Sequence, residues 1–184
     1  MKIVILDTET TGLPRLGAPL EEQPRVIELA ALVLYDARPP RRFNQLYNPG
    51  FPLPEEIVRI TGLTDAALAD APRLDIAELI RVETLLAGAD WIVAHNATFD
   101  MQMLQFEFER LNRPWCEYRT LDTADTARGV LGYRPKLAQL YKTFTADVRA
   151  RPAHRAMDDV ETLYMAVCAW PEVSDLVMDG VRHE

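Results

Sequence analysis

The amino-acid sequence predicts an α/β protein in which helices flank one mixed sheet. Short apolar runs typical of strands come early in the chain, segments with helical spacing then alternate with them, and helical segments dominate the last third. The length of 184 residues suits a single hydrophobic core, and no internal repeat, low-complexity segment or linker divides it. We therefore expect residues 1–184 to form one domain.

Four segments are predicted to be strands. The first is short and almost continuously apolar up to Asp7, which is typical of a strand buried on both faces in the middle of a sheet. The third alternates only weakly between apolar and polar residues. The predicted strands are residues 1–6, 26–35, 42–47 and 91–94.

Six segments are predicted to be helices from their apolar spacing and their boundaries. Prolines mark several boundaries, because proline lacks the N–H that a helix interior needs. Pro54 precedes the first helix, Pro114 follows the third, and Pro171 follows the last. The predicted helices are residues 55–60, 76–87, 97–111, 123–131, 137–144 and 156–169.

The composition excludes some classes of protein. Hydrophobic residues make up 48% and charged residues 26%, as in an ordinary globular protein. There is no apolar run of about 18 residues, so no membrane span is expected. Before Asp7 only residues 3–6 are apolar, which is too short for a secretory signal, so we expect a cytoplasmic location. Cys116 and Cys168 form no C-x-x-C pair.

The charge is unevenly distributed along the chain. The net charge of −8 argues against a nucleic-acid partner, but residues 128–155 carry +6 and the remainder carries −14. This basic segment is our candidate for a surface that grips a phosphate backbone, and the alternative is an ordinary solvated stretch. Its basic residues are Arg128, Arg134, Lys136, Lys142, Arg149, Arg151 and Arg155, and its acid is Asp147.

Asp7 and Glu9 form the first candidate site. Side chains two residues apart on a strand point to the same face, so both carboxylates project together where a buried strand ends. Two adjacent carboxylates repel each other, and a metal ion relieves the repulsion. Gly12 then permits a tight turn or the close approach of a ligand. The alternative is that both acids are merely solvated.

The second candidate site follows the strand at 91–94. His95 and Asn96 lead into a helix with Asp100 in its first turn. Acids in a first turn are also favoured by the helix dipole alone, so Asp100 taken by itself reads as a helix-start residue. His95 is likewise open to a structural role. Phe99 either packs in the core or presents its ring to a base.

The third candidate site contains His154, Asp158 and Asp159. In the helix predicted at 156–169, a helical rotation of about 100° per residue puts Asp159 on the flank of the apolar stripe and turns Asp158 toward solvent. His154 precedes the helix and is free to reach over the same site, although standing alone it would read as a loop histidine without a role.

Together these segments resemble the DnaQ-like exonucleases, the histidine-containing (DEDDh) branch of the DEDD superfamily. The resemblance covers residues 2 to about 168 and is nearest in character to the proofreading and exonuclease X branch. Many members carry His where this chain has Thr61. The matching motifs are D-T-E-T-T-G-L at 7–13, H-N-A-T-F-D at 95–100 and H-R-A-M-D-D at 154–159, with similar segments at 26–30, 48–50 and 61–64.

The resemblance implies a ribonuclease H-like fold with a central mixed five-stranded sheet, and a 3′→5′ exonuclease that releases nucleoside 5′-monophosphates. It implies that His154 is the general base and that two divalent ions, Mg²⁺ or Mn²⁺, bind to four carboxylates. Carboxylates are hard oxygen donors that suit these ions, and four negative charges match two divalent cations. The implied metal ligands are Asp7, Glu9, Asp100 and Asp159, and the implied nucleotide-binding residues are Thr10, Thr11, Gly12, Leu13, His95, Asn96 and Phe99.

Several alternatives stay open. Thr10, Thr11 and the N-P-G segment at 48–50 look more like DNA-directed members than like oligoribonuclease or ribonuclease T, so single-stranded DNA is favoured and RNA is the alternative. A non-catalytic nucleic-acid-binding domain would have lost a carboxylate or the histidine, and all five residues are present. The joint spacing disfavours an unrelated α/β protein. We expect no long C-terminal extension, so that the domain either acts alone or is bound directly by a polymerase or repair partner.

Overall fold

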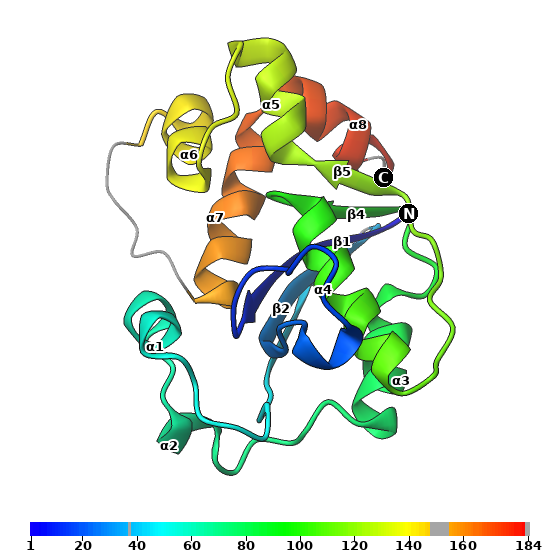
Figure 1. Cartoon of the computed structure of the whole chain (residues 1–184). Helices are drawn as coiled ribbons and strands as arrows, with labels where there is room; N and C mark the ends of the chain where they lie inside the picture. The colour runs from blue at the N-terminus through cyan, green and yellow to red at the C-terminus, as the bar shows by residue number, and fades with distance from the viewer. Residues whose placement is uncertain (37, 148–154, 183–184) are drawn as a thin grey trace.

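The computed structural model describes residues 1–36, 38–147 and 155–182, with side chains up to residue 176. It contains one mixed five-stranded sheet in the order β3-β2-β1-β4-β5 with helices on both faces, which confirms the predicted fold class (Figure 1). In chain order the elements are β1 (Lys2–Thr10), the 3₁₀ helix η1 (Leu20–Glu22), β2 (Val26–Tyr35), β3 (Arg38–Leu46), α1 (Glu55–Thr61), α2 (Asp65–Leu68), α3 (Ile76–Leu86), β4 (Trp91–Ala94), α4 (Ala97–Arg110), β5 (Thr120–Asp122), α5 (Thr123–Leu131), α6 (Leu137–Thr145), α7 (Ala156–Ala169) and α8 (Pro171–Arg182).

The central strand β1 has two neighbours of different length. It pairs antiparallel with β2 along its whole length, from Lys2↔Tyr35 to Glu9↔Glu28, with an irregularity before Thr10. It pairs parallel with β4 only as far as Ile5↔Val93. The second half of β1 therefore continues past the end of β4, and its main-chain groups on that side need partners other than a strand.

Alternate residues of β1 belong to two different cores. Ile3 and Ile5 pack with α5, α6, α7 and α8, whereas Val4 and Leu6 pack with α3 and α4. This alternation follows from the two-residue repeat of a strand buried on both faces. Because Asp7 and Glu9 continue the first series, they face the side of the sheet that α7 covers.

The structure corrects several predicted boundaries. β1 continues to Thr10, so Asp7 and Glu9 lie inside the strand and not beyond its end. β3 begins at Arg38 instead of residue 42, in a segment whose prolines and arginines conceal the strand signal. Proline and charged residues are characteristic of edge strands such as this one.

Four elements were not predicted. η1, α2 and β5 have only three or four residues, too few to show a period. α8 was missed because Pro171 was read only as the end of the preceding helix. Pro171 is in fact the first residue of α8, a position at which its missing N–H is not needed. None of the described helices combines the length and the apolar character that a bilayer crossing requires.

Candidate functional site

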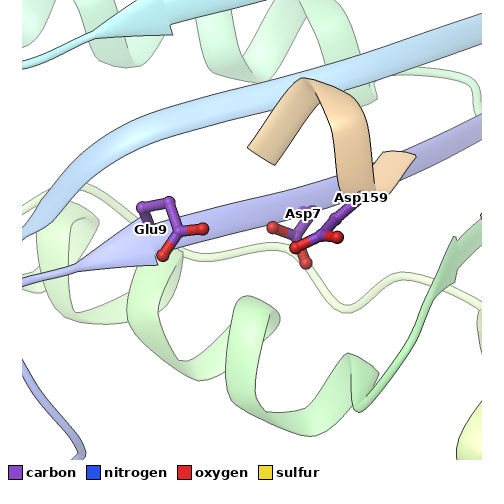
Figure 2. Close-up of side chains that lie close together, drawn as sticks. All are labelled: Asp7, Glu9 and Asp159. Atoms are coloured by element: carbon purple, nitrogen blue, oxygen red, sulfur yellow. The ribbon is translucent and has the colours of Figure 1, made fainter. Parts of the chain in front are cut away.

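Three carboxylates meet on the α7 face of the sheet. Asp7 and Glu9 project from the far half of β1, and Asp159 reaches them from the first turn of α7. One oxygen of each lies within 4.8 Å of the others (Figure 2). The side chains come from segments about 150 positions apart in the sequence, so only the packing of α7 on β1 brings them together.

The orientation of α7 decides which of two neighbouring acids joins the group. Ala156 and Val160 are fully buried against the sheet. Asp159 lies beside them and is partly buried, whereas Asp158 is exposed. The structure therefore confirms the helical spacing argument, which turns Asp159 toward the site and Asp158 toward solvent.

Asp100 approaches from the opposite face of the sheet. It lies in the first turn of α4, with 2% of its surface exposed. Its Oδ1 accepts one hydrogen bond from the main-chain N–H of Thr8 at 2.9 Å and another from the Thr8 hydroxyl at 2.7 Å. Asp100 is not among the three residues whose oxygens converge within 4.8 Å, but its charge acts on Asp7.

The electrostatics of the cluster oppose full ionisation. Burial, followed by the charges of Asp100, Asp159 and Glu9, raises the pKa of Asp7 well above its usual value. Burial and the charge of Asp159 raise the pKa of Glu9 to about 7. Burial also raises the pKa of Asp100 to about 7, although the two hydrogen bonds from Thr8 act in the other direction. A group of partly buried, mutually repelling carboxylates with converging oxygens fits divalent cations that prefer oxygen ligands, such as Mg²⁺ and Mn²⁺.

The end of β1 and the segment that follows it contain the predicted nucleotide-binding residues Thr10 to Leu13. The Thr10 hydroxyl donates to the Gly12 carbonyl at 2.7 Å, and the Thr11 hydroxyl accepts from the main-chain N–H of Arg25 at 2.9 Å. Both hydroxyls thus bond within the protein. The side chain of Leu13 is 77% exposed, so an apolar group stands in solvent directly after the acidic strand.

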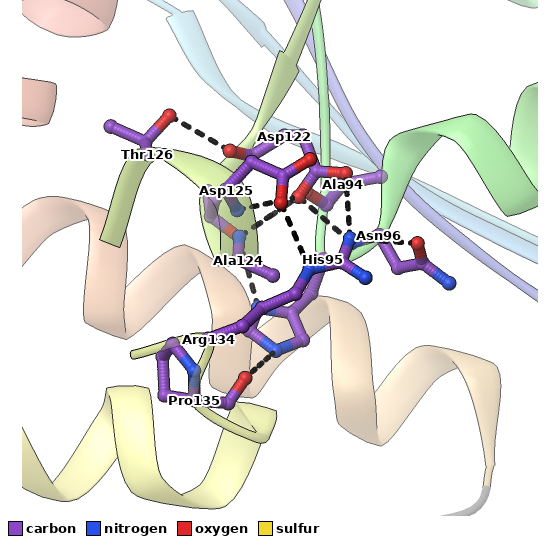
Figure 3. A network of polar contacts seen from close by, with 10 residues as sticks. Ala94, His95, Asn96, Asp122, Ala124, Asp125, Thr126, Arg134 and Pro135 are labelled. Atoms are coloured by element: carbon purple, nitrogen blue, oxygen red, sulfur yellow. Dashed lines mark hydrogen bonds and ion pairs between the residues drawn. The ribbon is translucent and has the colours of Figure 1, made fainter. Parts of the chain in front are cut away.

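His95 and Asn96 belong to a polar network where β4 and β5 end (Figure 3). The two ring nitrogens of His95 lie 3.0 Å from the Thr123 hydroxyl and 3.0 Å from the Pro135 carbonyl. Because a carbonyl can only accept, Nε2 must donate to Pro135. Burial lowers the pKa of His95, and the bond to Pro135 acts in the opposite direction.

Asn96 is the N-cap residue of α4. It adopts the left-handed conformation with φ of 84°, which asparagine tolerates better than most residues. Its side-chain oxygen accepts from Arg134 at 2.8 Å, and Arg134 also pairs with Asp122 and Asp125 (Figure 3). Phe99, in the first turn of α4, is partly buried against the core on that face. Binding of a nucleotide by His95, Asn96 and Phe99 stays a prediction.

His154, the predicted general base, lies outside the described residues. The basic segment 128–155 is only partly described as well. Lys136 and Lys142 are exposed, whereas Arg134 and Arg155 are engaged in ion pairs with acids of the same chain. The net charge of the segment therefore overstates the charge available to a phosphate backbone.

Sequence reasoning missed three residues around the acids. Thr8 carries no signal of its own, because its role depends on a bond to Asp100 in a distant helix. Glu28 and Arg155 form an ion pair beside the cluster. Glu28 does carry a signal, since it is the one charged residue inside the apolar run at 26–35. Its partner, however, is 127 positions away.

Known proteins are similar to this chain over nearly its whole length. The RNase_T family model, described as an exonuclease, matches residues 4–167. A bifunctional exonuclease/endonuclease protein of Mycobacterium tuberculosis (strain CDC 1551 / Oshkosh) is 34% identical over 160 residues, covering 85% of this chain and 24% of that protein. A PolC-type DNA polymerase III of Bacillus subtilis (strain 168) is 34% identical over 166 residues, covering 88% of this chain and 11% of that protein. The chain thus spans a quarter or less of the length of these curated relatives.

Two solved structures have a similar fold. Exonuclease X in complex with 5′-overhanging duplex DNA matches with a TM-score of 0.66 and 25% identity, covering 95% of this chain and 92% of the other. The nuclease domain of 3′hExo, a DEDDh family member bound to rAMP, matches with a TM-score of 0.68 and 17% identity, covering 100% and 94%. The second likeness concerns the fold alone. Both confirm the expected ribonuclease H-like architecture.

Proposed function

Since this chain belongs to the RNase_T exonuclease family, we propose that it removes nucleotides one at a time from the 3′ end of a nucleic acid with two divalent metal ions, Mg²⁺ or Mn²⁺. The observation that carries the proposal is the convergence of Asp7, Glu9 and Asp159 within 4.8 Å, with Asp100 on the other side of β1. Membership of the family makes the chain a nuclease domain and agrees with the resemblance in its three motifs.

The four carboxylates hold the ions in this proposal. When bound, two divalent ions supply an activated water and neutralise the charge that develops on the leaving 3′ oxygen. Asp7, Glu9 and Asp159 offer converging oxygens for this purpose, and the bonds from Thr8 fix the orientation of Asp100. The role of His154 is to take a proton from the attacking water on its ring nitrogen, because imidazole accepts protons near neutral pH. The product is a nucleoside 5′-monophosphate.

The terminal nucleotide is assigned to the segment after β1 and the start of α4. Leu13 supports this assignment, because its exposed apolar side chain lies in the chain shortly after Glu9 and can pack against a base. Phe99 is a second apolar surface on the Asp100 side. The assignment extends to Thr10, Thr11, Gly12, His95 and Asn96, which belong to the same two parts of the chain.

We favour DNA over RNA as substrate. Exonuclease X was solved with duplex DNA, and several similar proteins are PolC-type DNA polymerases. These relatives also suggest proofreading or repair, with a polymerase as partner. An exoribonuclease of the oligoribonuclease or ribonuclease T type is the alternative, and it ranks second because Thr10, Thr11 and the N-P-G segment at 48–50 look more like DNA-directed members.

A time course on 5′-labelled single-stranded DNA and RNA of equal sequence tests the proposal. The reactions contain Mn²⁺ or EDTA, and Asp7→Asn is the inactive control. We expect a ladder that shortens from the 3′ end in Mn²⁺ only, with DNA degraded faster than RNA. A faster RNA ladder would reverse the substrate preference. Degradation in EDTA, or by the Asp7→Asn protein, would overturn the metal mechanism, and no degradation of either strand would indicate a binding domain.

A further inference from the structure

A fifth carboxylate lies next to the three that converge. Glu28 is in β2 with none of its surface exposed, and it is directly opposite Glu9 in the register of β1 and β2. Opposite side chains of an antiparallel pair are about 5 Å apart at Cβ, and like charges in that position repel. Consistently, the charge of Glu28 is one of the causes that raise the pKa of Glu9, after burial and Asp159.

Arg155 occupies both oxygens of Glu28. Its Nε donates to Oε2 at 3.1 Å and its Nη2 donates to Oε1 at 3.1 Å. The main-chain N–H of Ala156 donates to Oε2 at 3.4 Å. This two-pronged geometry is the one in which a guanidinium binds a carboxylate most firmly. Glu28 is thereby bound to the start of α7 through both of its oxygens.

Arg155 is also hydrogen-bonded directly to Asp159. The carbonyl of Arg155 accepts the main-chain N–H of Asp159 at 3.1 Å, which is the first hydrogen bond of α7. Arg155 therefore joins β2 through its side chain and Asp159 through its main chain. Asp159 in turn meets Asp7 and Glu9 on the adjacent strand.

We propose that the ion pair between Arg155 and Glu28 is a positioning device for the metal centre. It holds the first turn of α7 on β2, so that Asp159 stays within reach of Asp7 and Glu9, and it keeps Glu28 from competing for the ions. The inference rests on the proposed metal-dependent function. It makes Arg155 and Glu28 positioning residues, which act through Asp159 and do not touch the substrate.

If the role of Arg155 were purely electrostatic, its removal would change the affinity for metal ions in the opposite direction. If Arg155 only offset the negative charge of the cluster, removing it would make the centre more negative and strengthen cation binding. If Arg155 positions Asp159, removing it weakens cation binding, because the ligand oxygens are no longer held together. The sign of the change in metal affinity separates the two roles.

The decisive variant is Glu28→Gln/Arg155→Gln, because it removes one negative and one positive charge and so leaves the net charge unchanged. The control is Arg42→Gln, which removes an exposed ion pair to Glu161. That pair also joins α7 to the sheet but lies away from the acids. Mn²⁺ binding is measured by titration calorimetry, and kcat and KM are measured on a 5′-labelled oligonucleotide.

We expect the double variant to bind Mn²⁺ about tenfold more weakly and to lose about tenfold in kcat, with KM changed less than about twofold. Arg155→Lys, which keeps the charge but loses the two-pronged geometry, should fall between it and the wild type. Arg42→Gln should match the wild type. If the double variant does not fold, Arg155→Lys alone decides, with a loss of Mn²⁺ affinity of about threefold or more expected.

Two results would overturn the positioning role. One is a folded double variant, or an Arg155→Lys protein, with the Mn²⁺ affinity of the wild type. The other is tighter Mn²⁺ binding by Arg155→Gln, which would indicate a charge effect. A wild-type protein that binds Mn²⁺ without degrading nucleic acid would refute the proposed function, while the Mn²⁺ titrations would still decide the role of the ion pair. A wild-type protein that binds no Mn²⁺ would overturn both.

Discussion

Asp100 Oδ1 accepts two hydrogen bonds from Thr8, one from its main-chain N–H at 2.9 Å and one from its hydroxyl at 2.7 Å. Thr8 lies between Asp7 and Glu9 on β1, in the part of the strand that has passed the end of β4. Asp100 thus takes the place of a neighbouring strand as partner of this N–H. The three consecutive residues Asp7, Thr8 and Glu9 thus present two carboxylates on one face of the sheet and orient a third, that of Asp100, on the other.

Replacing Thr8 by valine tests this bond, because valine keeps the shape and removes the hydroxyl. We expect Thr8→Val to lower Mn²⁺ affinity and kcat by about tenfold, since one of the two groups that orient Asp100 is lost. Thr8→Ser, which keeps the hydroxyl, serves as control and should retain most of both. Titration calorimetry and single-nucleotide release measure the two quantities. Equal behaviour of the two variants would show that the main-chain N–H alone orients Asp100.

The two neighbouring acids of α7 should differ sharply. Asp159 faces Asp7 and Glu9, whereas Asp158 is exposed. We expect Asp159→Asn to reduce kcat by at least about a hundredfold, because a ligand of the metal ions is lost. Asp158→Asn should stay within about twofold of the wild type, as is usual for an exposed residue. Initial rates on labelled oligonucleotide measure both, and comparable losses would contradict the observed orientation of the helix.

His154 is expected to act on the proton of the attacking water and not on the metal ions. His154→Ala should therefore lower kcat by a factor of about 10² to 10⁴, while Mn²⁺ affinity and Tm stay near those of the wild type. Steady-state rates, calorimetry and thermal melting separate these effects. A variant that keeps full activity, or one that no longer folds, would remove the general-base assignment.

The stability of the metal-free protein should depend on pH. Burial and neighbouring charges raise the pKa of Glu9 from 4.5 to about 7 and that of Asp7 well above its usual value, and burial raises that of Asp100 from 3.8 to about 7. A carboxyl whose pKa is higher in the folded than in the unfolded protein stabilises the fold while protonated, and this contribution is lost as the pH rises through the folded pKa. We expect the Tm in EDTA to fall by roughly 5–10 °C between about pH 5 and pH 8.

Divalent ions should reverse this dependence. Mn²⁺ binds the ionised carboxylates, so the increase in Tm that it causes should be larger at high pH than at low pH. Glu9→Gln removes one of the carboxyls whose pKa is raised and is the matched control. The Tm of this variant in EDTA should fall less over the same pH range. A metal-free Tm that is constant or rises between these two pH values would contradict the electrostatic description of the cluster.

The exposed lysines of the basic segment, Lys136 and Lys142, should contact the nucleic-acid strand. We expect Lys136→Glu/Lys142→Glu to weaken DNA binding and to reduce the slope of log K against log salt by about 1–2, because phosphate contacts release counterions. Arg38→Glu/Arg41→Glu makes the same charge change on exposed residues of the edge strand β3 and is the control. Fluorescence anisotropy over a range of salt concentrations gives the slopes. Equal slopes in the two variants would make the lysines ordinary solvated residues.

Local periodicity in the sequence was sufficient for much of the fold and of the site. The bounds of β2, β4, α5 and α7 agree with the predicted ranges, because each has a clear apolar period or a clear end signal. The two-residue repeat correctly put Asp7 and Glu9 on one face, and the helical repeat correctly separated Asp159 from Asp158. Such relationships depend only on residues a few positions apart.

Tertiary packing decided the rest. The start of β3 and the existence of β5 depend on neighbouring strands that supply hydrogen bonds, and not on a local period. The bond of Thr8 to Asp100 spans 92 positions and that of Arg155 to Glu28 spans 127. Residue identities alone do not rank such partners, because a buried charge can be matched by any distant group that the fold brings within hydrogen-bonding distance. The sequence by itself therefore determined which acids could act together, and the tertiary structure decided which side chains hold them in place.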